Sequence, residues 1–86
     1  MSLQSYFEFY GKTGHYILSK PIHGSQKAKW KNKSTLLVEL DLIINTELER
    51  LIMSYTGSVK VISPSFLKDK ILSNMEESKK LYKVKS

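Results

Sequence analysis

A change of hydrophobic period within residues 36–64 constrains the fold more than any other feature of this chain. From residue 36 to residue 44, apolar side chains alternate with others, which is the period-two pattern of a strand with one buried face. Over residues 48–55 the apolar side chains recur every three or four positions instead, as on one face of a helix. A second alternating run occupies residues 59–63. The segment therefore predicts a strand, a short helix and a second strand.

Local signals mark both ends of this helix. Thr46 and Glu49 have the spacing of a capping box, in which Thr46 accepts the Glu49 N–H and the Glu49 side chain reaches back to the cap. Gly57 follows the helix, where a residue that tolerates positive φ is favoured. We therefore expect Thr46 to cap a helix that extends to Tyr55.

The remaining predicted strands and helices complete the order of elements of a known fold. Residues 6–10 predict an aromatic-rich strand, residues 12–20 a short helix weakened by Gly14, and residues 27–33 a strand in which lysines alternate. Two β-α-β units joined by a hairpin predict an α+β fold, a ferredoxin-like β-α-β-β-α-β sandwich with an additional C-terminal helix. In that topology residues 6–10 and 36–44 form central strands, and the lysine-rich strand forms an edge.

The C-terminal helix is expected to begin at Pro64, with Ser63 as its N-cap. Its apolar stripe comprises Leu67, Ile71, Met75, Ser78 and Tyr82. Residues 4–82 are interpreted as a single domain, residues 1–3 as an expression remnant or disordered start, and residues 83–86 as a frayed basic tail.

Composition narrows the class of protein. The chain has 86 residues, with 14 basic and 8 acidic side chains and a formal net charge of +6. The absence of cysteine excludes disulfides, thiolate metal sites and a cysteine nucleophile. The sequence contains neither a signal-peptide pattern nor a long apolar stretch, which predicts a cytoplasmic chain with no membrane partner.

Residues that could carry catalysis or bind a metal do not form a recognisable constellation. His23 and Ser25 could belong to a nucleophilic triad, but no acidic residue has a compelling spacing to them. His15 and His23 lack an ordered carboxylate partner for a metal site. Glu39 and Asp41 share one strand face and are better explained as cross-strand partners of lysines. The sequence therefore predicts a chain that is not an enzyme and has no cofactor or metal site.

The basic strand is a candidate binding site. Lysines alternate around Trp30, and such a strand could follow a phosphate backbone while a base stacks on an aromatic ring. In a regular strand Trp30 faces away from the lysines, and the neighbouring central strand exposes acidic side chains rather than aromatic ones. A solvated edge strand is therefore favoured, and contact with nucleic acid or another anionic ligand is the alternative. The residues of this anionic contact are His23, Lys27, Lys29, Trp30, Lys31 and Lys33.

A second candidate surface is apolar. Leu37 and Ile43 project from the face of their strand opposite the buried one, with Tyr6 and Tyr10 expected on the adjacent strand. Exposed apolar groups on a sheet often mark an interaction surface, although the C-terminal helix could also cover them. Tyr6, Tyr10, Leu37 and Ile43 are therefore the candidates for self-association.

Three segments resemble the C-terminal part of bacterial WYL-domain transcriptional regulators. They are KPIHGSQ at residues 20–26, VELDLIINTELERLIMSYTGSVKVISP at residues 38–64, and SFLKDKI at residues 65–71, with Leu81-Tyr82 further along. In that family this region is the WCX domain, the extension that follows the WYL domain. The family often has an aromatic residue directly before the glycine after the helix, whereas Thr56 intervenes here.

The resemblance implies that this chain is a piece of a longer regulator. In the full-length members that the resemblance implies, a winged-helix DNA-binding domain is followed by a WYL domain and then by this extension. The present sequence contains neither a helix-turn-helix region nor the Trp-Tyr-Leu motif. The implied role is dimerisation and effector sensing that modulates DNA binding. The implied partners are a second copy, the preceding domains of the same chain, and DNA indirectly through them.

Overall fold

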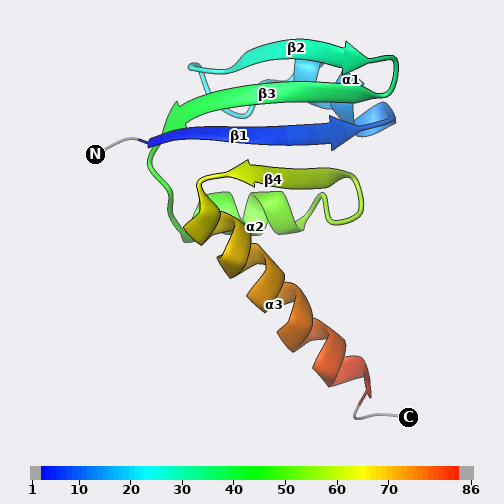
Figure 1. The fold of residues 1–86 in the computed structure, drawn as a ribbon, viewed down its shortest axis with the longest axis vertical. Helices are drawn as coiled ribbons and strands as arrows, with labels where there is room; N and C mark the ends of the chain where they lie inside the picture. The colour runs from blue at the N-terminus through cyan, green and yellow to red at the C-terminus, as the bar shows by residue number, and fades with distance from the viewer. Residues whose placement is uncertain (1–2, 84–86) are drawn as a thin grey trace.

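The computed structural model describes residues 3–83, which form four strands and three helices (Figure 1). In chain order they are β1 (Leu3–Tyr10), α1 (Lys12–Ser19), β2 (Lys27–Asn32), β3 (Thr35–Leu42), α2 (Thr46–Met53), β4 (Val59–Ser63) and α3 (Ser65–Lys83). Leu3, which was expected to precede the domain, belongs to β1 and pairs with Leu42. The expectations for residues 1–2 and 84–86 lie outside the described residues.

The strands form one antiparallel sheet in the order β2-β3-β1-β4. β1 and β3 pair along their full length, from Leu3 opposite Leu42 to Tyr10 opposite Thr35. These two strands are central, as their apolar content predicts, and the lysine-rich β2 is an edge strand. The fold is therefore a small α+β domain, which confirms the α+β class expected from the sequence.

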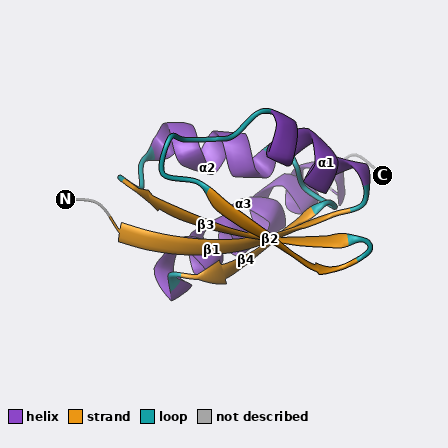
Figure 2. Ribbon diagram, turned by 90° about the horizontal axis from the view of Figure 1, so that it is seen from above, coloured by secondary structure: helices purple, strands orange, loops and turns teal. Residues whose placement is uncertain are grey.

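The helices leave one side of the sheet uncovered. α1 and α2 lie on one face, and α3 packs beside β4 and α2 (Figure 2). No helix among the described residues lies across the other face of β1, β2 and β3, which is the side seen in Figure 1. The core lies between the sheet and the helices and comprises Phe7, Phe9, Ile17, Leu36, Val38, Leu40, Leu48, Ile52, Val61, Leu67 and Ile71.

The N-terminus of α2 corrects the predicted capping box. The cap is Asn45, whose side-chain oxygen accepts the Leu48 N–H at 2.9 Å, and Thr46 is the first helical residue. The helix also ends at Met53, earlier than expected, so Tyr55 lies in the following turn. Tyr55 still contacts the core, because its ring meets the edge of Phe9 at a centroid distance of 5.8 Å.

The start and the stripe of α3 also differ from expectation. The helix begins at Ser65, and the Pro64 carbonyl accepts the Lys68 N–H at 3.2 Å, so Pro64 rather than Ser63 occupies the cap position. Leu67 and Ile71 are buried as predicted. Tyr82, at the end of the predicted stripe, is 80% exposed, because the second half of α3 extends away from the rest of the domain (Figure 1).

Candidate interaction surface

The uncovered side of the sheet brings the two predicted surfaces together. In the strand register, Lys27 lies opposite Glu39, and Glu39 lies opposite Tyr6. Directly opposed residues project to the same side of a sheet, so the lysines of β2 and the tyrosines of β1 share one surface. We call this surface the open face and define it by Tyr6, Glu8, Tyr10, Lys27, Lys29, Lys31, Leu37, Glu39, Lys60 and Ile62.

A row of four side chains crosses the whole sheet on the open face. Lys29, Leu37, Glu8 and Lys60 are successive partners from β2 through β3 and β1 to β4. A depression of about 540 Å³ lies over this row and is also lined by Ile62, which is 41% exposed. The row therefore has a leucine and a buried carboxylate at its centre and cations at both ends.

Glu8 is the buried acidic group at the centre of the open face. Its carboxylate accepts hydrogen bonds from Lys31 Nζ at 2.7 Å and from the Tyr10 hydroxyl at 2.9 Å. The bond from Lys31, followed by that from Tyr10, lowers the pKa of Glu8 below its usual value of 4.5, although burial acts in the opposite direction. Burial, with the bond to Glu8, raises the pKa of Tyr10.

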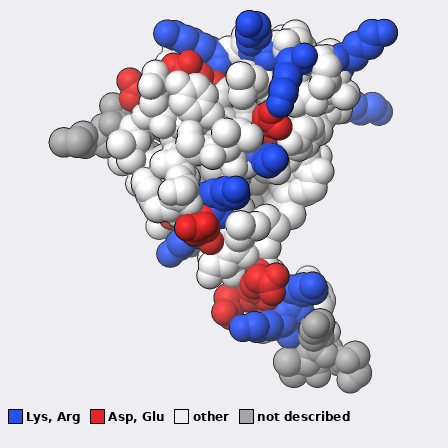
Figure 3. Space-filling model, in the orientation of Figure 1, with Lys and Arg blue, Asp and Glu red and all other residues white. Residues whose placement is uncertain are grey.

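The open face carries more positive than negative charge. Within the described residues, Lys31 has a carboxylate partner in Glu8, whereas Lys27, Lys29 and Lys60 form no ion pair. Glu39 instead accepts a hydrogen bond from the Gln4 amide at 2.6 Å. Figure 3 shows this side of the molecule, with basic side chains concentrated towards its β2 edge. The surface therefore attracts anionic or acidic partners.

Trp30 and Lys33, two residues of the predicted anionic contact, lie outside the open face. The ring of Trp30 packs against His15 of α1 at a centroid distance of 4.7 Å, so it faces the helices and not the lysines, as the alternation of the strand predicts. Lys33 lies in the exposed turn between β2 and β3. Trp30 therefore cannot stack a base on the side of the sheet that carries the lysines. The aromatic rings on that side are Tyr6 and Tyr10 of β1.

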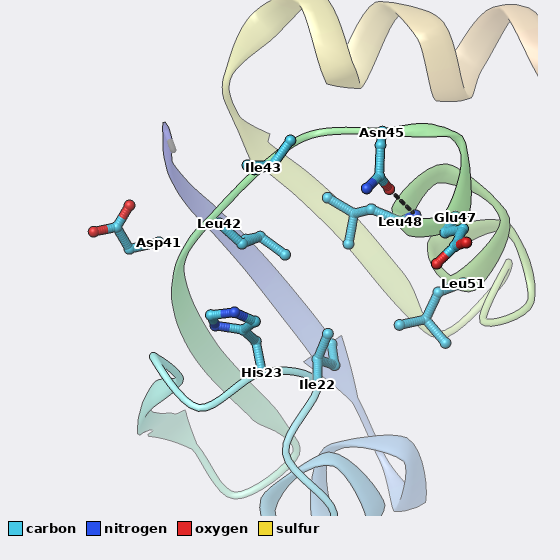
Figure 4. Close-up of a pocket in the computed structure, with 9 residues that line it drawn as sticks. All are labelled: Ile22, His23, Asp41, Leu42, Ile43, Asn45, Glu47, Leu48 and Leu51. Carbon is cyan, nitrogen blue, oxygen red and sulfur yellow. Dashed lines mark hydrogen bonds between the residues drawn. The ribbon is translucent and has the colours of Figure 1, made fainter. Parts of the chain in front are cut away.

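A second concave region contains His23 and Ile43, the other two candidate residues that lie outside the open face. Its volume is about 640 Å³, and it lies between the α1–β2 loop, the end of β3 and the start of α2 (Figure 4). We call it the hollow; its lining residues are Ile22, His23, Asp41, Leu42, Ile43, Asn45, Glu47, Leu48 and Leu51. Ile43 was expected on the open face, but β3 ends at Leu42, so the alternation does not continue to Ile43. His23 likewise lies here, apart from the lysines of β2.

Hydrogen bonds of the KPIHGSQ segment hold one wall of the hollow against β3. The Ser25 hydroxyl donates to the Asp41 carbonyl at 3.0 Å and accepts the Asp41 N–H at 2.9 Å. His23 Nδ1 accepts the Ser25 N–H at 3.1 Å and lies 2.8 Å from Ser25 Oγ. The Gln26 amide bonds the backbone of Ile17 and Ile22. These side chains clamp the loop, and Ser25 Oγ bonds both backbone groups of Asp41.

The described residues form neither a metal-binding cluster nor a membrane-spanning helix. Within residues 3–83, no three His, Asp or Glu side chains come close enough together to hold a metal ion. Across the same residues, every helix is too short or too polar to cross a membrane.

Comparison with known proteins assigns no family: no family model matches the chain, and a search of curated proteins finds no similar sequence.

Proposed function

We propose that this chain is the C-terminal regulatory domain of a bacterial transcriptional regulator of the WYL type and that it acts by binding rather than by catalysis. The observation that carries the proposal is the open face, an uncovered sheet surface that combines tyrosine, leucine and lysine side chains. Such a surface suits contact with another domain or molecule. Two groups that could act chemically are engaged in the fold, because Ser25 bonds the Asp41 backbone and Glu8 bonds Lys31.

The proposed fold is ferredoxin-like. The order β2-β3-β1-β4, with both central strands antiparallel and each β-α-β helix on the same face, supports it. In the KPIHGSQ segment, which carries part of the resemblance to the WYL family, Ser25 and Gln26 form hydrogen bonds that hold the loop in place.

The proposed mechanism is a shift between two arrangements of a cytoplasmic, dimeric regulator. An effector or a neighbouring domain that binds one arrangement more tightly biases the DNA affinity of the N-terminal helix-turn-helix domain. The open face would supply the contacts with the preceding WYL domain. Its excess of lysines favours an acidic surface on that domain.

A second candidate function is favoured by a specific observation. Tyr6 and Tyr10 share a surface with Lys27 and Lys29, and a sheet that combines aromatic and basic side chains is a common platform for single-stranded nucleic acid. In this function the open face would bind phosphates through lysines and stack bases on Tyr6. Tyr10 is less suited to stacking, because its hydroxyl is held by Glu8.

The reading frame upstream of Met1 tests the regulator proposal. A helix-turn-helix segment followed by a WYL segment, both in frame with this chain, is the expected result. A start codon at Met1 that is used in the cell would contradict it, because the chain would then lack the domains that it is proposed to regulate.

Oligonucleotide binding separates the two candidates. Fluorescence anisotropy with a labelled single-stranded DNA would be measured for the native chain and for Lys27→Gln/Lys29→Gln across a range of salt concentrations. Binding that weakens steeply with salt and falls in this variant supports the nucleic-acid function. The matched control is Lys12→Gln/Lys70→Gln, which removes the same charge from exposed positions on α1 and α3. No binding at low salt rules out the second candidate.

A further inference from the structure

The end of α3 lacks a partner within the described residues. Leu81 is 71% and Tyr82 80% exposed, and Figure 1 shows this part of the helix extending away from the domain. A single helical segment without tertiary contacts is only marginally stable in water, so its apolar side chains favour a covering surface. Lys79 and Lys80 add positive charge beside them.

The hollow has the complementary character. Its walls are largely aliphatic, with Ile22, Leu42 and Leu48 facing a common space (Figure 4). Glu47 contributes a carboxylate to the hollow, whereas the Asp41 carboxylate points away from it (Figure 4), and the lining contains no lysine or arginine. In a chain with 14 basic and 8 acidic side chains, this is an unusual location, and it suits an apolar group accompanied by a cation.

The end of α3 cannot enter the hollow of its own chain. α3 has 19 residues and therefore extends about 28 Å from its start beside β4. Because the helix is continuous and begins next to α2, its last turn lies far from the start of α2 (Figure 1). A helix end that meets this hollow must come from another molecule.

We propose that two copies of this chain form a reciprocal dimer in which the end of α3 of each copy occupies the hollow of the other. Leu81 and Tyr82 would contact the aliphatic walls, and Lys80 would face Glu47. The inference rests on the dimeric part of the proposed function and assigns that dimer to a defined contact. Two-fold symmetry forms this contact twice, which strengthens an interface that would be small if formed once.

Charges elsewhere are consistent with this choice. Two open faces brought together would oppose lysines that have no carboxylate partner, so the open face is poorly suited to binding its own copy. Lys80 lies 3.8 Å from Glu77 in an exposed pair on the same helix. Exposed pairs of this kind contribute little, so Lys80 can exchange Glu77 for Glu47 of the partner at small cost.

A charge-swap experiment tests the contact. The dimer dissociation constant would be measured by analytical ultracentrifugation for the native chain, for Glu47→Lys, for Lys80→Glu, and for an equimolar mixture of the two variants. Each variant alone is expected to raise the dissociation constant at least ~tenfold. The mixture is expected to recover native-like association, because a heterodimer has one native contact and one contact with both charges reversed.

Cysteine cross-linking locates the contact independently. The chain has no cysteine, so Glu47→Cys and Tyr82→Cys each introduce one thiol without background. Mixing the two variants under oxidising conditions should give a disulfide between them. Disulfides formed solely between two Tyr82→Cys chains would mean that the helix ends pair with each other, and this result would overturn the proposal.

A control variant and two further outcomes complete the test of the reciprocal dimer. Leu18→Ser, which changes an exposed leucine on α1, should leave the dissociation constant unchanged. If Leu81→Ser/Tyr82→Ser dimerises as the native chain does while Tyr6→Ser/Leu37→Ser does not, the dimer forms through the open face; the present inference then fails and the proposed dimer stands. A native chain that remains monomeric at every concentration overturns the inference as well.

Discussion

Lys31 on β2 reaches across β3 to bond Glu8 on β1, with 2.7 Å between Nζ and Oε2. The two strands are not neighbours, so the lysine stem must cross the open face near Leu37, the register partner of Glu8. A shift in the β2–β3 register between Trp30 and Asn32 accompanies this arrangement. The contact therefore links three strands and supplies charge compensation for the most buried carboxylate of the sheet.

This contact predicts a specific dependence of stability on pH. Because the pKa of Glu8 is lowered in the folded chain, ionised Glu8 stabilises the fold above the usual carboxyl pKa of 4.5, and this stabilisation is lost as pH falls through the lowered value. Glu8→Gln should therefore reduce the free energy of unfolding by ~1 kcal/mol at neutral pH, and the difference from the native chain should shrink at about pH 3. Urea unfolding at the two pH values measures it.

Glu77→Gln is the matched control, since Glu77 belongs to an exposed ion pair. It should change stability by less than ~0.5 kcal/mol at either pH. An equal loss in Glu8→Gln at both pH values would mean that packing of the side chain, and not its charge, accounts for the effect.

The cap of α2 gives a second prediction. Asn45→Ala removes the acceptor of the Leu48 N–H and should lower the free energy of unfolding by ~1 kcal/mol. Thr46→Ala should change it by less than ~0.5 kcal/mol, because Thr46 lies within the first turn and its hydroxyl forms no hydrogen bond in the described structure. Thermal or urea unfolding of the two variants decides between the cap that the structure contains and the capping box that the sequence suggests.

The elements were predictable because their signals are local. The change of period after residue 44 depends on side chains within one segment, and β3, α2 and β4 follow it closely. The cap was misplaced because Asn45 and Thr46 are both good cap residues in adjacent positions, and the extended backbone of Asn45 decides between them. Sequence alone does not contain that backbone angle.

The candidate sites were less predictable because they depend on register and on distant segments. Tyr6 and Lys27 were assigned to separate surfaces, and the pairing of both with Glu39 places them on one. The Lys31–Glu8 contact needs the register shift in β2. The hollow was missed because its walls meet through the Ser25–Asp41 hydrogen bonds, which join positions sixteen residues apart. The HGSQ sequence, whose polar residues favour a turn, was the available signal, but it does not indicate which segment the loop contacts.

Gly14 on α1 gives a third prediction, which opposes simple helix propensity. A Cβ added there would lie 3.3 Å from Leu36 Cβ, 3.3 Å from the Trp30 ring and 3.4 Å from the Phe9 carbonyl oxygen. Leu36 is fully buried and the Phe9 oxygen belongs to the central strand, so neither can move easily. Gly14→Ala should therefore destabilise the chain by ~1 kcal/mol instead of stabilising the helix.

Chemical unfolding of Gly14→Ala, with Ser19→Ala at the exposed end of the same helix as a control, measures this effect. A more stable Gly14→Ala chain would mean that α1 can move away from the sheet at no cost. The proximity of α1 to Leu36 would then be incidental to stability.

The Ser25 clamp gives a fourth prediction with a residue-specific measurement. Ser25→Ala removes the acceptor of the Asp41 N–H and the donor to the Asp41 carbonyl, and because Asp41 is exposed, water can replace both. The free energy of unfolding should therefore fall by only ~0.5–1.5 kcal/mol. The amide hydrogen of Asp41 should exchange with solvent markedly faster, since its protecting oxygen is gone. Ser73→Ala, an exposed change on α3, should alter neither quantity. Unchanged exchange at Asp41 in Ser25→Ala would mean that the loop is held against β3 by Gln26 and the wall of the hollow rather than by the serine hydroxyl.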